Sequence, residues 1–149
     1  MTKMIVFDMD GTLCDFYGVE GWLTDLHLEN IRPYVEAEPL YNMEELKNIL
    51  NMVKLNGWRI CVTTWLAKDS TKEFKKATKQ AKIEWLEKYD FPYDEAHFVQ
   101  YGTTKANVTR TKADFQILID DNKKVRDGWN LGTTVNANYD ITKFLKALI

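Results

Sequence analysis

Short apolar segments alternate along this chain with longer segments in which apolar residues recur at helical spacing. The short segments have the length and composition of strands, and they cover residues 3–8, 58–63, 97–99, 115–119 and 133–135. Two parallel strands require a long crossover between them, which is usually a helix. The alternation therefore predicts an α/β protein with a mostly parallel central sheet flanked by helices.

Two of the longer segments have a clear helical pattern. Residues 42–56 carry apolar side chains at helical spacing, and the pair Asn56-Gly57 ends the pattern. Residues 69–89 form a longer pattern with one apolar face and lysines elsewhere; that face carries Phe74, Ala77, Ala81 and Trp85. The other elements that we expect are a loop or flap over 14–24, a helix from Thr24 that ends before Pro33, and a closing helix over 140–148.

Length and composition suit one domain over residues 1–149, because 45% of the residues are apolar and supply a sizeable core. A net charge of −2 gives no overall attraction to nucleic acid or to an anionic membrane. No apolar run approaches the ~20 residues of a membrane span, and the N-terminus does not resemble a signal segment. We interpret Cys14 and Cys61 as free thiols of a reducing compartment, and we expect a soluble, cytoplasmic protein.

The first expected strand leads directly into two aspartates and a glycine, in the run Met4-Ile5-Val6-Phe7-Asp8-Met9-Asp10-Gly11-Thr12-Leu13. Residues two positions apart on a strand share a face, so Asp8 and Asp10 can point the same way at its end. Gly11 permits the sharp turn that follows. Such a site suits a metal and a phosphate, with one carboxylate as nucleophile and the other transferring protons. The structural alternative is an acidic turn, which Asp and Gly also favour.

Polar residues stand at the ends of two further strands, where ligands bind in an open parallel sheet. Thr63 and Thr64 end one strand, and their hydroxyl and backbone N–H groups suit phosphate oxygens. Lys105 follows another strand in a loop that contains glycine, where it can offset the charge of the aspartates. Threonine is also an ordinary strand residue and lysine an ordinary surface residue, so each has a structural alternative.

A third strand end carries the pair Asp120-Asp121. Magnesium takes a few carboxylate ligands and keeps several waters, so Asp120 can complete an oxygen-rich magnesium site with Asp8. An acidic pair that begins a turn is the alternative explanation.

In their order along the chain, the motifs Asp-x-Asp-Gly-Thr-Leu, apolar-Thr, Lys and apolar-Asp-Asp resemble the four motifs of the haloacid dehalogenase superfamily. The resemblance covers most of the chain. It implies a Rossmann-like, three-layer α/β fold and Mg²⁺-dependent phosphoryl transfer through an aspartyl-phosphate. The aspartate at position 10 implies a phosphatase, because dehalogenases and P-type pumps of this superfamily do not have this acid/base.

The resemblance also implies a role for each matching residue. Asp8 is the nucleophile and a metal ligand, and Asp10 is the general acid/base and gives its backbone carbonyl to the metal. Asp120 is a further metal ligand, and Asp121 holds metal-bound water. The phosphate-binding residues are Gly11, Thr12, Thr63, Thr64 and Lys105.

Two other basic residues lie closer to Asp120 in the sequence than Lys105 does. They are Arg110 and Lys112. We prefer Lys105 because the stretch 102–104 provides a loop at a strand end, whereas 110–112 precedes the next strand.

The sequence constrains the choice of substrate less than it constrains the type of reaction. About 50 residues separate Leu13 from Thr63, and the core helices need many of them, so any cap is small and lies within 14–35. A small cap leaves an open site for a small phosphorylated substrate such as a nucleotide. Four aromatic residues that flank the motifs can stack on a base or pack in a flap: Phe16, Tyr17, Trp22 and Trp65. The first and last motifs are also similar to those of 5′(3′)-deoxyribonucleotidases.

The lysine-rich segment 69–89 suggests a different class of function. A basic helix can bind nucleic acid, as in a polynucleotide 3′-phosphatase or a non-catalytic nucleic-acid-binding protein. Acidic residues are interspersed among these lysines, which favours an ordinary solvated helix.

Overall fold

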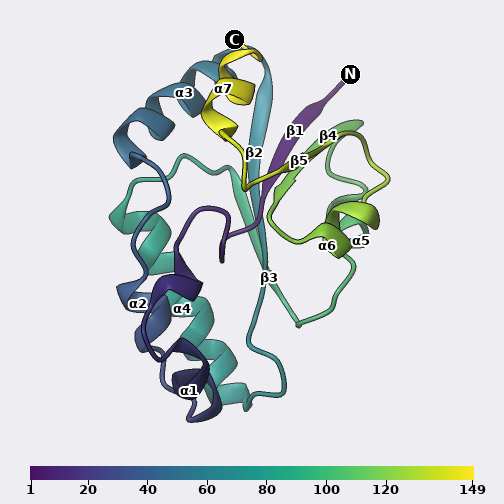
Figure 1. The fold of residues 1–149 in the computed structure, drawn as a ribbon. Coiled ribbons are helices and arrows are strands. Elements are labelled where there is room, and N and C mark those ends of the chain that lie inside the picture. Colours follow the sequence, from purple (N-terminus) through teal and green to yellow (C-terminus); the bar gives the residue numbers. More distant parts are fainter.

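The computed structural model describes residues 1–149 and is built around a five-stranded parallel sheet (Figure 1). The strand order is β3-β2-β1-β4-β5, so the N-terminal strand lies at the centre. The strands are β1 (Lys3–Phe7), β2 (Trp58–Trp65), β3 (Glu95–Val99), β4 (Phe115–Asp120) and β5 (Thr134–Asn136). This architecture confirms the predicted α/β class with a parallel sheet.

Helices cover both faces of the sheet and make three layers (Figure 1). One face carries α1 (Trp22–His27), α2 (Arg32–Glu36), α3 (Met43–Leu55), α4 (Lys72–Lys88) and α7 (Ile141–Lys146). The other face carries the two short helices α5 (Lys105–Thr109) and α6 (Lys123–Asp127). Alternate residues of β1 separate the two cores: Ile5 and Phe7 pack in the larger one, and Met4 and Val6 in the smaller one. No helix is both long and apolar enough to cross a membrane.

The two long helices begin at side-chain caps. The Asn42 side chain accepts a hydrogen bond from the backbone N–H of Glu45 at the start of α3. Thr71 accepts one from the backbone N–H of Phe74 at the start of α4. These contacts satisfy donors that a helix leaves free in its first turn, and they set the bounds close to the predicted segments 42–56 and 69–89.

The segment before α3 differs from the prediction. A single helix was expected from Thr24 to a point before Pro33. The structure has two helices here instead: α1 ends at His27 and α2 begins at Arg32. Proline is tolerated in the first turn of a helix, where its missing N–H has no partner, so Pro33 begins a helix here and does not end one. The expected loop over 14–24 contains only one short 3-10 turn, η1 (Phe16–Gly18), before α1 begins.

The register of the sheet places the ends of three strands at one edge. Phe7 of β1 pairs with Val62 of β2 and with Ile119 of β4. The residues that follow them therefore come to the same level, and these are Asp8, Thr63 and Asp120.

Candidate active site

A cavity of about 250 Å³ opens at this edge of the sheet. Its polar wall comes mainly from the ends of strands β1, β2 and β4, the segments that follow them, and α5. It consists of Asp8, Asp10, Thr64, Lys68, Lys105, Asp120, Asp121 and Asn122. Aromatic side chains form much of the remaining wall, among them Phe16, Tyr17, Trp22, Tyr34, Trp65 and Tyr101. Residues from almost the whole length of the chain thus meet at the position predicted for the site.

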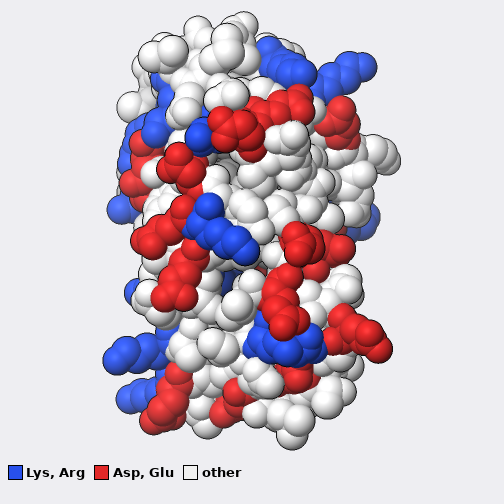
Figure 2. Space-filling model, turned by 90° about the vertical axis from the view of Figure 1, so that its left-hand side faces the viewer, with Lys and Arg blue, Asp and Glu red and all other residues white.

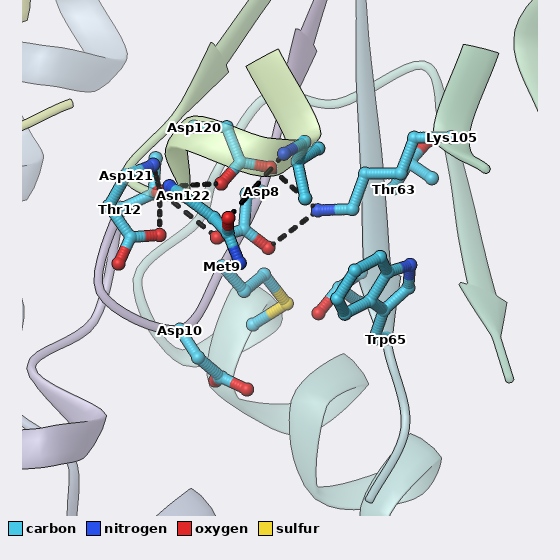
Figure 3. Close-up of polar contacts among 12 residues, drawn as sticks. Asp8, Met9, Asp10, Thr12, Thr63, Trp65, Lys105, Asp120, Asp121 and Asn122 are labelled. Atoms are coloured by element: carbon cyan, nitrogen blue, oxygen red, sulfur yellow. Dashed lines mark hydrogen bonds and ion pairs between the residues drawn. The ribbon is translucent and has the colours of Figure 1, made fainter. Parts of the chain in front are cut away.

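The centre of the site is an ammonium group between two carboxylates (Figure 3). Lys105 Nζ lies 2.9 Å from Asp8 Oδ1 and 2.9 Å from Asp120 Oδ2, and all three side chains are buried. Burial opposes the charge of the lysine, but Asp8 and Asp120 outweigh it and raise the pKa of Lys105. Burial likewise opposes the charge of Asp8, yet Lys105 outweighs it and lowers the pKa of Asp8. Asp8 is therefore held as a carboxylate, the form that a nucleophile requires.

Asp121 adds a further carboxylate to this cluster. Burial and then the charge of Asp8 raise its pKa to about 7, and burial and Asp8 also raise the pKa of Asp120. One oxygen of each of Asp8, Asp120 and Asp121 lies within 4.8 Å of the others. Hard cations such as Mg²⁺ bind carboxylate oxygens, and three clustered carboxylates carry more negative charge than the single ammonium group of Lys105 offsets. These residues fit a divalent cation.

The turn after β1 positions the aspartates. Gly11 has a φ of +80°, and a Cβ at this position would collide with the carboxylate of Asp121. The Thr12 hydroxyl is 3.1 Å from Asp8 Oδ2 and 3.3 Å from Asp121 Oδ1. It also accepts a hydrogen bond from the backbone N–H of Asp121. Thr12 is fully buried, so the structure places its hydroxyl on the carboxylates and away from the open cavity.

The two carboxylates of the first motif have different surroundings. The strand ends at Phe7, so the alternation of strand side chains does not extend to Asp10, whose direction is set by the turn. Figure 3 shows Asp10 apart from the group formed by Asp8, Asp120 and Asp121. Both Asp8 and Asp10 nevertheless line the same cavity.

The structure separates the two threonines at the end of β2. The strand continues to Trp65, so adjacent residues point to opposite faces. Thr64 lines the cavity, whereas the Thr63 hydroxyl lies 3.5 Å from Cys61 Sγ and is not part of the cavity wall. The hydroxyl that faces the cavity is thus the one of Thr64.

The three basic residues considered for the third motif are also separated. Lys105 opens α5, a short helix where a loop was expected, and its side chain enters the site. Arg110 is exposed and its guanidinium bonds to Asn107 and Asn130. Lys112 is exposed as well. Of the three, only Lys105 reaches Asp8.

Lys82 was not identified as a site residue from the sequence. We expected the lysines of 69–89 to lie away from the apolar face, but Lys82 is only 1% exposed. Its ammonium group bonds to Asp10, Thr64 and the backbone of Trp65. The only signal in the sequence is that Lys82 follows Ala81 and precedes Trp85 by three positions, which places it at the border of the buried face.

The aromatic residues of the cavity differ in their exposure. Phe16 is 2% exposed and packs against Tyr17 and Tyr34, with ring centroids 5.3 and 4.7 Å away, so it belongs to the core of the flap. Tyr17 is 53% exposed, and Trp22 and Trp65 are half-buried. Of the four aromatic residues proposed from the sequence, these three present accessible ring surface to the cavity.

The face formed by α2, α3 and α4 carries both signs of charge. Figure 2 shows lysine and arginine side chains interspersed with aspartate and glutamate over this face, without a continuous basic patch. A nucleic-acid backbone requires a basic surface along its path. The mixed charge therefore favours the solvated-helix interpretation of 69–89.

Comparisons with known proteins agree with this fold. No protein-family model matches the chain, and no curated protein matches it. Among solved structures, the fold is similar to that of a D,D-heptose 1,7-bisphosphate phosphatase from Burkholderia thailandensis. The TM-score is 0.57 at 15% sequence identity, and the match covers 97% of this chain and 96% of the other. The likeness confirms the predicted Rossmann-like α/β fold.

Proposed function

We propose that this protein is a Mg²⁺-dependent phosphatase that hydrolyses a phosphomonoester through an aspartyl-phosphate. The observation that carries this proposal is the buried Lys105 ammonium group between Asp8 and Asp120, with Asp10 and Asp121 at the same cavity. The fold that the chain shares with a bisphosphate phosphatase supports the same reaction class.

The carboxylates of Asp8 and Asp120, with the backbone carbonyl of Asp10, would hold Mg²⁺, and Asp121 would orient metal-bound water. The ion would neutralise charge between the phosphate and the carboxylates and polarise a phosphoryl oxygen. Without a cation, a dianionic phosphate would face several carboxylates, and of the residues that line the cavity only Lys68 and Lys105 carry ammonium groups. Lys105 and the Thr64 hydroxyl supply donors to the phosphoryl oxygens.

The proposed reaction has two steps at phosphorus. In the first step, Asp8 attacks the phosphorus atom and the bond between phosphorus and the leaving oxygen breaks. Asp10 gives that oxygen a proton. Asp10 then removes a proton from a water molecule, which attacks the phosphorus of the aspartyl-phosphate. The bond to Asp8 breaks, inorganic phosphate leaves, and Asp8 and Asp10 return to their starting states.

We further propose that residues 14–35 act as a small cap and that the substrate is a nucleotide. This segment packs on α4, where Glu29 accepts hydrogen bonds from the backbone and hydroxyl of Thr71 at 2.8 and 2.9 Å. The partly exposed rings of Tyr17, Trp22 and Trp65 offer stacking surface for a base. The buried thiols Cys14 and Cys61 are unpaired, which agrees with a cytoplasmic location.

A phosphatase screen tests this proposal. Purified protein with Mg²⁺ is assayed on an aryl phosphate, nucleoside monophosphates, sugar phosphates and oligonucleotides with 3′ or 5′ phosphate. We expect hydrolysis of the aryl phosphate and preference for nucleoside monophosphates, and no activity in Asp8→Asn. The matched control is Asp127→Asn, because Asp127 is an exposed partner of Lys123. Undiminished activity in a folded Asp8→Asn variant would contradict the mechanism, and preference for oligonucleotides would favour a polynucleotide phosphatase.

A further inference from the structure

Lys82 is a charged residue in a position that would suit an apolar one. It lies on α4 between Thr78, Ala81 and Trp85, which are all buried, and its own side chain is 1% exposed. Taking an ammonium group out of water is costly unless it is paired and fully hydrogen-bonded. A leucine or methionine here would bury apolar surface at no such cost, so the contacts of the charge are informative.

All three N–H donors of the Lys82 ammonium group have partners. They bond to Asp10 Oδ2 at 3.0 Å, to Thr64 Oγ1 at 2.6 Å and to the backbone carbonyl of Trp65 at 2.9 Å. These three residues line the cavity of the candidate active site. Lys82 therefore connects the turn after β1 to the end of β2, and it has no donor left for a phosphate.

The same contact fixes the carboxylate of Asp10. Oδ2 accepts from Lys82, and Oδ1 lies 3.5 Å from the Cys14 thiol. Burial keeps the pKa of Cys14 well above its usual value, so this thiol remains a weak donor. Both oxygens of Asp10 thus have a contact that fixes the carboxylate at the cavity wall, and their remaining lone pairs are free for a proton.

The two aspartates of the first motif each have their own lysine, and the lysines come from opposite faces of the sheet. Lys105 of α5 bonds to Asp8, and Lys82 of α4 bonds to Asp10. The two contacts keep the carboxylates in separate surroundings, although only Met9 lies between them in the chain.

We propose that Lys82 is a positioning residue that holds Asp10 in the orientation in which it transfers protons. This inference rests on the proposed phosphatase function. It assigns Lys82 an effect on the proton-transfer steps that acts through Asp10, without contact with the phosphoryl group. Its loss should therefore lower kcat/KM, which reports the step that forms the aspartyl-phosphate, most where the leaving oxygen needs a proton.

The test compares Lys82→Met with Lys76→Met, which removes an exposed lysine from the same helix. Each is assayed with Mg²⁺ on p-nitrophenyl phosphate, a good leaving group, and on ethyl phosphate, a poor one. General acid catalysis contributes about 100-fold or more, so we expect kcat/KM of Lys82→Met to fall about 100-fold on ethyl phosphate and clearly less on p-nitrophenyl phosphate. Lys76→Met should match the wild type on both.

A double variant separates positioning from any other role. In Lys82→Met/Asp10→Asn both charges are absent, so no unpaired charge is left buried and the fold is retained more easily than in Lys82→Met. If Lys82 acts through Asp10, this variant should turn over both substrates at the rate of Asp10→Asn alone, within about twofold.

Three results would overturn the inference, and they differ from one another. A further large loss in the double variant means that Lys82 acts independently of Asp10. Equal losses of kcat/KM for Lys82→Met on the two substrates mean that it only supports the fold, which circular dichroism and Tm check directly. Absence of Mg²⁺-dependent hydrolysis by the wild-type protein on either substrate removes the proposed function itself.

Discussion

Replacing Lys105 with methionine removes the ammonium group between Asp8 and Asp120 and keeps the length of the side chain. The lysine side chain is 3% exposed and makes both ion pairs at 2.9 Å, so two buried carboxylates lose their common partner. Breaking a buried ion pair by removing one partner costs about 3–5 kcal/mol. In a chain of this size such a loss lowers the Tm of the metal-free protein by roughly 10 °C.

The same substitution should also reduce catalysis. An electrostatic donor at the reacting group in a water-poor site contributes about 2–5 kcal/mol to transition-state stabilisation, which corresponds to roughly 30-fold to 5000-fold in kcat/KM. We expect a loss in this range, measured on an aryl phosphate with saturating Mg²⁺ at a temperature where the variant is folded. Lys112→Met is the matched control, because Lys112 is exposed and its side chain is outside the site.

Two results would refute this reasoning. The first is a Lys105→Met variant that keeps both the wild-type Tm and the wild-type kcat/KM, because the two ion pairs would then contribute nothing. The second is a larger loss of activity in Lys112→Met than in Lys105→Met, which would move the phosphate contact to Lys112 and leave the aspartate chemistry in place.

Three further predictions concern the metal, the turn and the substrate. The pKa of Asp121 is raised to about 7, so the protonated form stabilises the metal-free fold at low pH and this stability is lost as pH rises through about 7. Mg²⁺ should therefore raise Tm more at about pH 8 than at about pH 5. In the activity assay, EDTA should abolish hydrolysis, and added Ca²⁺ should restore hydrolysis poorly. Gly11→Ala should weaken Mg²⁺ binding in a titration and lower stability by about 1–2 kcal/mol, because its Cβ meets Asp121 at positive φ. Trp22→Ala and Trp65→Ala should each lower kcat/KM for a nucleoside monophosphate by about 1–3 kcal/mol and leave ethyl phosphate unchanged, whereas uniform losses would argue against stacking.

The parts of the structure that follow from local pattern could be predicted from the sequence. The strand that leads into Asp8 and the strand that ends at Asp120 each combine an apolar run with acidic residues at a turn. Parallel pairing then brings their ends to one edge, so the meeting of Asp8 and Asp120 required no knowledge of side-chain packing.

Lys82 could not be predicted in the same way. A lysine in a lysine-rich helix is ordinarily solvated, and its burial here depends on Asp10 and Thr64, which are distant in the sequence. For a related reason, the sequence could not show which of Thr63 and Thr64 faces the cavity. Their directions depend on how far β2 continues, and the strand ends two residues later than the apolar pattern.

The short helices could not be predicted from the spacing of apolar residues either. Helices α5 and α6 have five residues each, which is too few for an apolar periodicity to appear. Pro33 was taken as a helix end, although proline favours the first turn equally well.

The most direct test of the proposed mechanism is to trap the aspartyl-phosphate. Asp10→Asn protein is mixed with Mg²⁺ and p-nitrophenyl phosphate, because loss of the base should slow hydrolysis of the intermediate while the good leaving group still departs. Borohydride then reduces an acyl phosphate to an alcohol, and peptide mass spectrometry locates the modified residue. We expect conversion of Asp8 to homoserine only when substrate is present. Modification of a different aspartate, or turnover by the wild-type protein with no trapping at Asp8, would contradict the mechanism.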